Sequence, residues 1–350
     1  MMAIQIGEHR IGVGGNTFIV AEIGVNHDGK IDRALELVQI ASDCGADAVK
    51  LQIFQAEMLM HQSVNFAEYQ EKSTVDASPR EMLKRYELSD EDLSHLVDAI
   101  RGAGMLPLAT PFSMRDVLRI EALALPAIKI ASPDLVNWPL LRAASQSGLP
   151  LLVSTGASNI NEISSSIAWL RGWGSTFALL HCTSCYPTPF VEANLCWISE
   201  LKLRFDVPIG FSDHTTDNIS GSLAVAAGAC IVEKHLTYDR NAPGPDHSAS
   251  ADPEQFAQYV RLIRLADRMM GKPGKHVLDI EKDVRSVSRQ SLVAARDLRP
   301  GQVIREEDLI VQRPGTGIPA SALPFLVGKR ATQRIRGGEM ISWKTVCDAA

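Results

Sequence analysis

Short apolar runs alternate with longer segments of helical periodicity along most of the chain. In chain order the runs are FIVAEIG, AVKLQIF, LPLATPFS, AIKIAS, LLVSTG, FALLHCT, PIGFSDH and CIVEKHL. Such runs indicate buried strands, and the segments between them indicate amphipathic helices. Strands that alternate with helices pair in parallel through right-handed crossovers, and eight such units can close a barrel. The pattern therefore predicts an α/β protein built on a (β/α)8 TIM barrel.

Capping residues mark the ends of several predicted helices. Ser89 is a suitable N-cap and Gly102 a suitable stop for the helix in SDEDLSHLVDAIRGAG, and Asn161 is predicted to open the helix in NEISSSIAWLRG. The last helical pattern, DPEQFAQYVRLIRLADRMMG, ends near Gly271. The barrel domain is therefore predicted to span residues 1–271.

The pattern changes after the barrel. Residues 272–285 are predicted to be a linker, because the segment that makes up most of this range, GKPGKHVLDIEKD, is polar. From about residue 286 the chain has short strand-like pieces broken by glycine and proline, such as SLVAARDLRPGQVIREEDLIVQRPG. Residues 286–350 are therefore predicted to form a small β-rich domain. Its core is small, so the domain is expected to pack against another surface.

Polar residues stand at the carboxyl end of every predicted strand. In chain order they are Glu22 and Asn26, Lys50 and Gln52, Thr110, Lys129 with Ser132 and Asp134, Ser154 and Thr155, Thr183 with Ser184 and Tyr186, Ser212 with Asp213 and His214, and His235. One such residue alone is typical of a solvated loop. In a barrel, however, these strand ends meet at one mouth, where the chemistry takes place. Two lysines and several hydroxyls there are typical of a phosphate or carboxylate pocket.

Two histidines and a carboxylate complete this series. His214 follows the seventh strand and His235 ends the eighth, in the stretch EKHLTYDRNAPGPDHSAS. A single histidine after an apolar run is more often a structural side chain than a ligand. Two on adjacent strands direct two imidazoles toward one point, which favours an open site for a divalent metal. Asp246, on the loop after strand eight, is predicted to reach a metal-bound water or a substrate hydroxyl.

The balance of charged residues limits the kinds of molecule that the protein is expected to bind. The chain has 350 residues, with 35 lysines and arginines against 41 aspartates and glutamates, and a formal net charge of −6. Without a basic excess, nucleic acid is not an expected partner, and the cationic residues are expected to act locally on small anions. The segment MMAIQIGEHRIGVGG lacks a continuous apolar core, and no apolar run reaches the ~18 residues of a membrane span. A cytoplasmic location without membrane attachment is therefore expected.

The cysteines do not form a disulfide framework. They are Cys44, Cys182, Cys185, Cys196, Cys230 and Cys347. They are scattered through apolar segments, which predicts reduced and mostly buried thiols. Cys182 and Cys185 form a C-x-x-C motif, but no second pair exists to complete a structural zinc site.

At these motifs the sequence resembles the sialic acid synthase family, which includes N-acetylneuraminate, N-acylneuraminate 9-phosphate, legionaminate and pseudaminate synthases. The resemblance is carried by AEIGVNHDG, VKLQ, ATPFS, KIAS, STG, LLHCTSCYPTP, GFSDHT, EKHLTYDRNAPGPDHSAS and QRPGTG. These motifs occur in order over nearly the whole chain and are highly specific for the family. They specify the sugar substrate poorly.

The resemblance implies both a reaction and an assembly. Family members have a barrel followed by an antifreeze-like SAF domain. They condense phosphoenolpyruvate with an N-acyl mannosamine or a related 2,4-diamino hexose, and they release phosphate and a nine-carbon 2-keto acid. The implied cofactor is a divalent metal ion, Mn²⁺, Mg²⁺ or Co²⁺. The implied partner is a second copy in a domain-swapped homodimer, in which Arg313 of QRPGTG reaches the sugar in the other barrel.

The resemblance also implies a role for each strand-end residue. Glu22 would orient or deprotonate the attacking water, and His214 and His235 would ligate the metal. The phosphoenolpyruvate site would consist of Lys50, Thr110, Lys129, Ser132, Ser154, Ser184 and Ser212. The residues facing the sugar would be Gln52, Asp134, Tyr186, Asp246 and Arg313. Ser184 stands where many members have asparagine, and Asp134 stands where some have glutamate.

Two other functions are compatible with a polar barrel mouth. One is a phosphoenolpyruvate-dependent 3-deoxy-aldulosonate synthase acting on a phosphorylated aldose; such sites commonly carry a metal-binding cysteine near strand one, and AEIGVNHDG has none. The other is a non-enzymatic binding protein with a relic barrel. The polar residues at every strand end disfavour that alternative.

Overall fold

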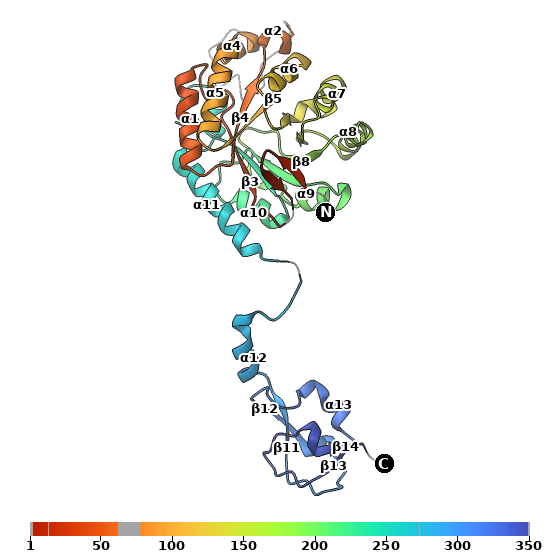
Figure 1. Ribbon diagram of the computed structural model, residues 1–350. Coiled ribbons are helices and arrows are strands. Elements are labelled where there is room, and N and C mark those ends of the chain that lie inside the picture. Colours follow the sequence, from red (N-terminus) through yellow and green to blue (C-terminus); the bar gives the residue numbers. More distant parts are fainter. Residues whose placement is uncertain (1–2, 13, 62–77, 273, 349–350) are drawn as a thin grey trace. The chain divides into compact units, whose positions relative to one another are not determined.

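The first part of the protein is a closed barrel (Figure 1). The computed structural model describes residues 3–12, 14–61, 78–272 and 274–348, and the chain divides into two compact units, Met1–Lys272 and Pro273–Ala350. Within the described residues of the first unit, eight parallel strands close in the order β10-β3-β4-β5-β6-β7-β8-β9. They are β3 (Phe18–Glu22), β4 (Ala48–Ile53), β5 (Leu106–Pro111), β6 (Ile128–Ile130), β7 (Leu151–Ser154), β8 (Phe177–Cys182), β9 (Ile209–Asp213) and β10 (Ile231–His235). The predicted TIM barrel is confirmed.

Helices follow the strands and surround the barrel (Figure 1). They are α1 (Ile31–Asp43), α2 (Ala56–Leu59), α4 (Pro79–Arg85), α5 (Asp90–Gly102), α6 (Met114–Ala122), α7 (Trp138–Gln146), α8 (Ile160–Gly172), α9 (Cys196–Phe205), α10 (Ser220–Ala227) and α11 (Pro253–Met270). As predicted, the Ser89 side chain caps α5 by accepting a hydrogen bond from the Asp92 amide, and α5 ends at Gly102.

The start of α8 corrects one predicted boundary. Asn161 is the second residue of this helix, and Asn159 is its N-cap. The Asn159 side chain accepts hydrogen bonds from the amides of Asn161 and Glu162, and the Glu162 side chain accepts one from the Asn159 amide. This reciprocal capping box stabilises the earlier start.

Alternation along the strands separates the two sides of the barrel wall. Every second strand residue, such as Ile19 and Ala21 of β3, packs outward against the helices in one apolar cluster. The intervening residues near the strand starts, such as Phe18 and Val20, point inward and form a second apolar cluster. The hairpin of β1 (Ile4–Ile6) and β2 (His9–Ile11) packs its isoleucines into this cluster. Apolar side chains therefore fill the barrel interior near the strand starts, and polar side chains occupy the inward positions at the carboxyl ends.

The second unit is small and antiparallel. β11 (Ser291–Ala294) pairs with β12 (Leu309–Gln312), and β13 (Arg330–Ala331) pairs with β14 (Val346–Cys347). Its core includes Leu292, Ile304 and Ile341, and α13 (Leu323–Leu326) lies between the strand pairs in sequence. The residues predicted as a linker are partly helical, because α12 (Lys282–Ser288) begins there.

The cysteines and the helices bear on two further predictions. All six thiols are free, as predicted. The prediction that they are mostly buried is wrong: Cys182 is buried, whereas Cys185, Cys196 and Cys347 are exposed. Over the described part of the chain, no helix combines the length and the apolar character needed to cross a bilayer.

Candidate active site

A cavity of about 440 Å³ opens at the carboxyl ends of the barrel strands. Most of the predicted site residues line it: Lys50, Gln52, Thr110, Lys129, Ser132, Asp134, Ser154, Ser184, Tyr186, Ser212, His214, His235 and Asp246. Apolar residues form another part of its wall, including Phe54 and Phe112, which follow strands β4 and β5, and Met82 of α4. The structure thus brings together side chains from strands β4 to β10, as the strand-end argument predicted.

Two predicted site residues lie outside the cavity lining. Glu22 is fully buried; its Oε1 accepts a hydrogen bond from Gln52 Nε2 at 2.9 Å, and its Oε2 lies 2.8 Å from Lys50 Nζ. It therefore touches two lining residues without lining the cavity itself. Arg313 is an exposed residue of the second unit and directly follows β12.

Four other strand-end residues do not contribute to the cavity lining. Asn26 donates to the backbone oxygen of Leu236, and the hydroxyls of Thr155 and Thr183 donate to backbone oxygens. Asp213 forms a buried ion pair with Lys234 at 2.9 Å. Lys234 Nζ also lies 4.8 Å from the centre of the Tyr259 ring on α11. The Asp213–Lys234 ion pair therefore lies on the outer side of the barrel wall, against α11. The prediction that these four residues join the cavity is wrong, because their side chains are directed to other partners.

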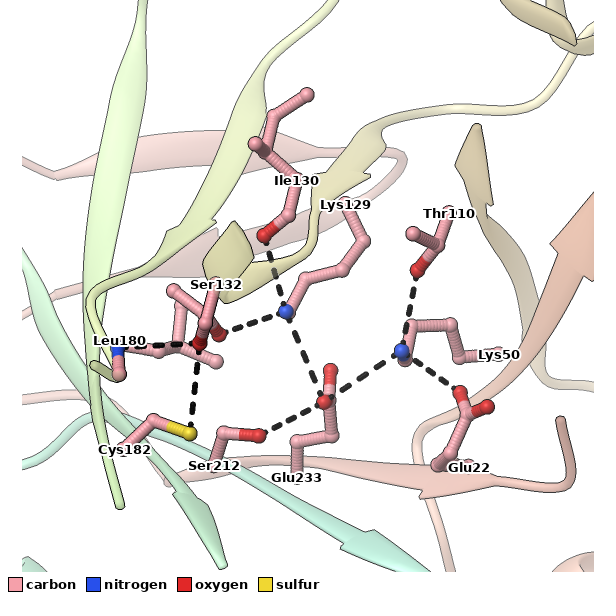
Figure 2. Close-up of polar contacts among 12 residues, drawn as sticks. Glu22, Lys50, Thr110, Lys129, Ile130, Ser132, Leu180, Cys182, Ser212 and Glu233 are labelled. Atoms are coloured by element: carbon pink, nitrogen blue, oxygen red, sulfur yellow. Dashed lines mark hydrogen bonds and ion pairs between the residues drawn. The ribbon is translucent and has the colours of Figure 1, made fainter. Parts of the chain in front are cut away.

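Two lysines and two glutamates form the polar centre of the site (Figure 2). Lys50 Nζ lies 2.8 Å from Glu22 Oε2, 3.1 Å from Thr110 Oγ1 and 3.5 Å from Glu233 Oε1. Lys129 Nζ donates to Ser154 Oγ at 2.7 Å and lies 3.8 Å from the same Glu233 oxygen. All four charged side chains are buried, so their charges are screened little by solvent.

Glu233 is a central residue that the sequence reasoning missed. Its Oε1 accepts a hydrogen bond from Ser212 Oγ at 2.9 Å, and its buried Oε2 has no hydrogen-bond partner among the described residues. Burial raises the pKa of Glu233, but the ammonium groups of Lys129 and Lys50 outweigh this and lower it to about 2. The signal was present in the sequence: in a strand, residues two apart share a face, so Glu233 points the same way as His235.

The surroundings shift the pKa values of the two lysines in opposite directions. Burial lowers the pKa of Lys129, and Glu233 opposes the shift without cancelling it. Burial also disfavours the charged form of Lys50, but Glu22 and Glu233 together raise its pKa. Burial raises the pKa of Glu22. Glu233 is therefore the anion that both ammonium groups share.

The two histidines face each other across adjacent strands. Their ring centres are 5.5 Å apart. His214 Nδ1 lies 2.9 Å from the Thr183 oxygen and 3.7 Å from Cys182 Sγ, and His235 Nδ1 lies 3.5 Å from Asp246 Oδ2. Tyr186 packs on His214 with the ring centres 4.1 Å apart. These Nδ1 contacts orient both rings, and within the described residues neither Nε2 atom is engaged in a hydrogen bond.

This donor set fits an open metal site. Within the described residues, no group of three histidine, cysteine, aspartate or glutamate side chains is arranged to hold an ion. Burial, with a further contribution from His214, lowers the pKa of His235 well below its ordinary value, which favours the neutral imidazole that binds metals. Burial, with a further contribution from the Glu22 carboxylate, raises the pKa of Asp246 to about 6, although Lys50 opposes this shift. If they held an ion, the two imidazoles would leave its other coordination positions to water and substrate.

Comparison with known proteins places both units in families. Residues 37–275 match the NeuB family. The chain belongs to the NeuB family. Residues 289–346 match the SAF domain, so the predicted resemblance is confirmed for both parts of this NeuB-family chain.

Individual relatives are similar over most of the NeuB-family chain. The N,N'-diacetyllegionaminic acid synthase of Legionella pneumophila is 39% identical over 335 residues, which cover 94% of this chain and 94% of the relative. The N-acetylneuraminate-9-phosphate synthase of Mus musculus is 31% identical, with 95% and 94% covered. A crystal structure of the sialic acid synthetase of Leptospira borgpetersenii with citrate has a TM-score of 0.75 and 31% identity, with 81% of this chain and 95% of that chain covered. The names of these relatives differ in their product.

Proposed function

We propose that this NeuB-family enzyme is a nonulosonic acid synthase that condenses phosphoenolpyruvate with an N-acyl mannosamine or a related 2,4-diamino hexose. The supporting observation is one cavity in which two buried ammonium groups and several hydroxyls lie beside two facing imidazoles. Ammonium groups and hydroxyls satisfy the oxygens of a phosphate and a carboxylate. The imidazole pair suits an aldehyde that must be activated for attack.

The half of the cavity that is lined by the two lysines would hold phosphoenolpyruvate. Lys50 and Lys129 would neutralise its phosphate and carboxylate. The hydroxyls that would complete the site belong to Thr110, Ser132, Ser154, Ser184 and Ser212, all of which line the cavity. Serine at position 184 is shorter than the asparagine of many relatives, so one hydrogen bond to phosphoenolpyruvate would be made by a hydroxyl or a water there.

The other half would hold the open-chain sugar and a divalent ion. His214 and His235 would ligate the ion, which supplies Lewis-acid polarisation of the sugar aldehyde when bound. Gln52, Asp134, Tyr186 and Asp246 line this cavity and would face the sugar hydroxyl and acylamino groups. Asp134 is shorter than the glutamate of some relatives, which leaves more room for the acceptor.

The proposed reaction forms one C–C bond and one C–O bond and breaks the C–O bond to phosphate. C3 of phosphoenolpyruvate attacks the aldehyde carbon, which forms the new C–C bond and leaves an oxocarbenium centre at C2. The C=O π pair of the aldehyde moves onto its oxygen, which takes up a proton and becomes a hydroxyl of the product. Water then adds to C2, and the C2–O bond to phosphate breaks as the new oxygen becomes the keto oxygen. Glu22, which contacts the lining residues Gln52 and Lys50, would orient this water and accept its proton through them.

A substrate panel tests the proposed function. Phosphate release and product mass are measured with phosphoenolpyruvate and each of N-acetylmannosamine, its 6-phosphate, 2,4-diacetamido-2,4,6-trideoxy-mannose and arabinose 5-phosphate. In ¹⁸O-water the label is expected in the keto acid and not in phosphate. Turnover with arabinose 5-phosphate alone would favour a 3-deoxy-aldulosonate synthase instead, and no metal-dependent turnover with any acylated amino sugar would contradict the proposal.

Lys129→Ala is expected to weaken phosphoenolpyruvate and leave the sugar little affected. Losing a charge-assisted hydrogen bond costs on the order of 2 kcal/mol, which corresponds to roughly thirtyfold in apparent affinity. Steady-state kinetics with each substrate varied in turn measure the effect. An unchanged apparent affinity for phosphoenolpyruvate would place the anion away from Lys129.

Glu233→Gln is expected to make phosphoenolpyruvate binding sensitive to alkaline pH. Because Glu233 is the main group that opposes the burial effect on Lys129, the variant should lower the pKa of Lys129 further. The ammonium is present below that pKa, so affinity should be lost as the pH rises, and at a lower pH than in the wild type. Calorimetric titration of phosphoenolpyruvate from pH 6 to 9 measures it, with an expected loss of about tenfold for each unit of pKa change at the alkaline end.

Glu200→Gln provides the matched control for that titration. Glu200 lies on α9, its side chain is 56% exposed, and its partner is Arg204 rather than a cavity residue. Its variant should keep the wild-type profile. If the pH profile of Glu233→Gln matched those of the wild type and of Glu200→Gln, Lys129 would keep its proton without this glutamate, contrary to the prediction.

We further propose that the active enzyme is a domain-swapped homodimer in which Arg313 completes the partner's sugar site. The charge distribution supports docking of the second unit on a barrel. Residues 273–350 hold 13 lysines and arginines against 9 aspartates and glutamates, a net charge of +4, and residues 1–272 hold 22 against 32, a net charge of −10. Opposite net charges favour association of the two kinds of unit.

A further inference from the structure

The loop that carries Asp246 has little regular structure to hold it. It runs from the end of β10 to the start of α11 and contains a short 3-10 turn at His247–Ala249 and one bridge between Leu236 and Ala251. Within the described residues the Asp246 carboxylate accepts no hydrogen bond, and its contact with His235 is 3.5 Å long. The direction of this carboxylate is therefore set through the backbone on either side of it.

Hydrogen bonds to the loop after β3 hold that backbone. His247, the residue next to Asp246, is 1% exposed. Its Nε2 lies 3.0 Å from Asp28 Oδ1, and its Nδ1 lies 2.6 Å from Thr237 Oγ1. Asp28 also accepts a hydrogen bond from the Tyr238 hydroxyl at 2.7 Å. Burial raises the pKa of Asp28, but the hydrogen bonds from His247 and Tyr238 lower it below its ordinary value, so the carboxylate is ionised and His247 Nε2 donates to it.

Asp246 is also held from its other side. Ser250 Oγ donates to the Asp246 backbone oxygen at 2.7 Å, and Asn26 Nδ2 donates to Ser250 Oγ at 2.8 Å. Gly244 packs directly on the His247 ring, because a Cβ there would lie 2.7 Å from His247 Cδ2. The NHDG and PGPDHS segments, more than 200 residues apart, thus hold each other by side chains that do not line the cavity.

We propose that His247 is a positioning residue, whose imidazole, fixed between Asp28 and Thr237, holds the Asp246 carboxylate toward the sugar. The inference rests on the proposed function, because it takes Asp246 to face the sugar. A carboxylate must lie within a fraction of an ångström of its working position, and a displacement of about 1 Å costs on the order of a hundredfold in rate. His247 itself touches no substrate; it acts through Asp246.

Kinetics of three variants measure this action. His247→Ala and Asp28→Ala should each lower kcat/KM for the amino sugar by roughly ten- to a hundredfold and leave the apparent affinity for phosphoenolpyruvate within about twofold. His247→Gln should recover most of the loss, because its amide nitrogen reaches the position of Nε2 and can donate to Asp28. Equal losses for His247→Ala and His247→Gln would overturn the proposal.

A double-mutant cycle distinguishes positioning from general stability. If His247 acts through the Asp246 carboxylate, His247→Ala should cost nothing further in an Asp246→Asn background. His181→Ala is the matched control: His181 is also a buried histidine that contacts a loop oxygen, that of Ala193 at 2.8 Å, but it lies on the outer face of β8. Any loss from His181→Ala should add in full to that of Asp246→Asn. Full additivity for His247→Ala as well would refute the positioning role.

Hydrogen exchange tests the same inference without turnover. In His247→Ala, the amides of residues 236–252 should exchange at least about tenfold faster than in the wild type, whereas those of β3 to β9 should not change. Unchanged exchange in this loop would overturn the inference even if the enzyme is active. An inactive wild type whose loop loosens in His247→Ala would instead contradict the proposed function alone.

Discussion

Replacing either His214 or His235 by alanine is expected to abolish metal-dependent turnover while the barrel remains folded. The two rings face each other at the mouth with their Nδ1 atoms already oriented, and each lies at the end of a strand rather than in the apolar interior. Removing a residue that only hydrogen-bonds to a metal ligand commonly lowers metal affinity or activity 10- to 100-fold. Removing one of two protein ligands should therefore lower activity by more than about a hundredfold. Phosphate release as a function of Mn²⁺ concentration measures the effect.

Two readouts independent of turnover accompany this experiment. Binding of Mn²⁺, followed by electron paramagnetic resonance, should weaken in step with activity in both variants. The thermal midpoint should stay close to that of the wild type, because neither ring belongs to the apolar clusters of the barrel. His181→Ala removes a histidine of similar burial from the outer face of β8 and should retain Mn²⁺ binding. Normal metal titration and activity in either site variant would contradict the assignment.

The barrel was predictable from sequence because its signal is repeated. Eight apolar runs separated by helical segments leave few alternatives, and Ser89 and Gly102 mark the ends of α5 as predicted. The start of α8 was placed two residues late because both Asn159 and Asn161 are acceptable caps by type. The Glu162 side chain, which returns to the Asn159 amide, decides between them. Repeated tertiary patterns are therefore easier to predict than a single local boundary.

The cavity was predictable in outline for a related reason. Strand ends converge in a barrel, so residues such as Lys50, Lys129 and His235 had to come close together. Strand-end position alone does not say which way a side chain points, and Asp213 shows the consequence, since it pairs with Lys234 on the outer side of the wall. Applying the two-residue alternation would have removed Asp213 and added Glu233.

Other features of the site could not be predicted from local patterns. The shared contacts of Glu233 with both lysines, and the contact of Asp28 with His247, join residues that are far apart in the sequence. Such contacts depend on the twist of the barrel and the path of its loops. The same holds for Glu22, whose strand-end position predicted a lining residue but whose side chain lies beneath Gln52 and Lys50.

Arg313→Ala and His235→Ala are each expected to be nearly inactive alone and to regain about a quarter of wild-type activity when unfolded and reassembled together. If Arg313 completes the site of the other subunit, about half of the dimers are mixed, and each mixed dimer has one intact site. That site combines His235 from one chain with Arg313 from the other. An exposed arginine is ordinarily a solvated surface residue, with no effect on activity, so the two possibilities predict different behaviour already in the single variant.

The mixed sample also decides which chain supplies the arginine. If Arg313 served the barrel of its own chain, every site in a mixed dimer would carry one defect, and reassembly would restore nothing. Subunit exchange is verified with two affinity tags, so that pairs holding both tags can be isolated; each such pair should show close to half of wild-type activity per dimer, since one of its two sites is intact. As control, His214→Ala mixed with His235→Ala places both defects in the barrel. Because no reassorted site then escapes a defect, that mixture should stay inactive whether or not the second units are swapped.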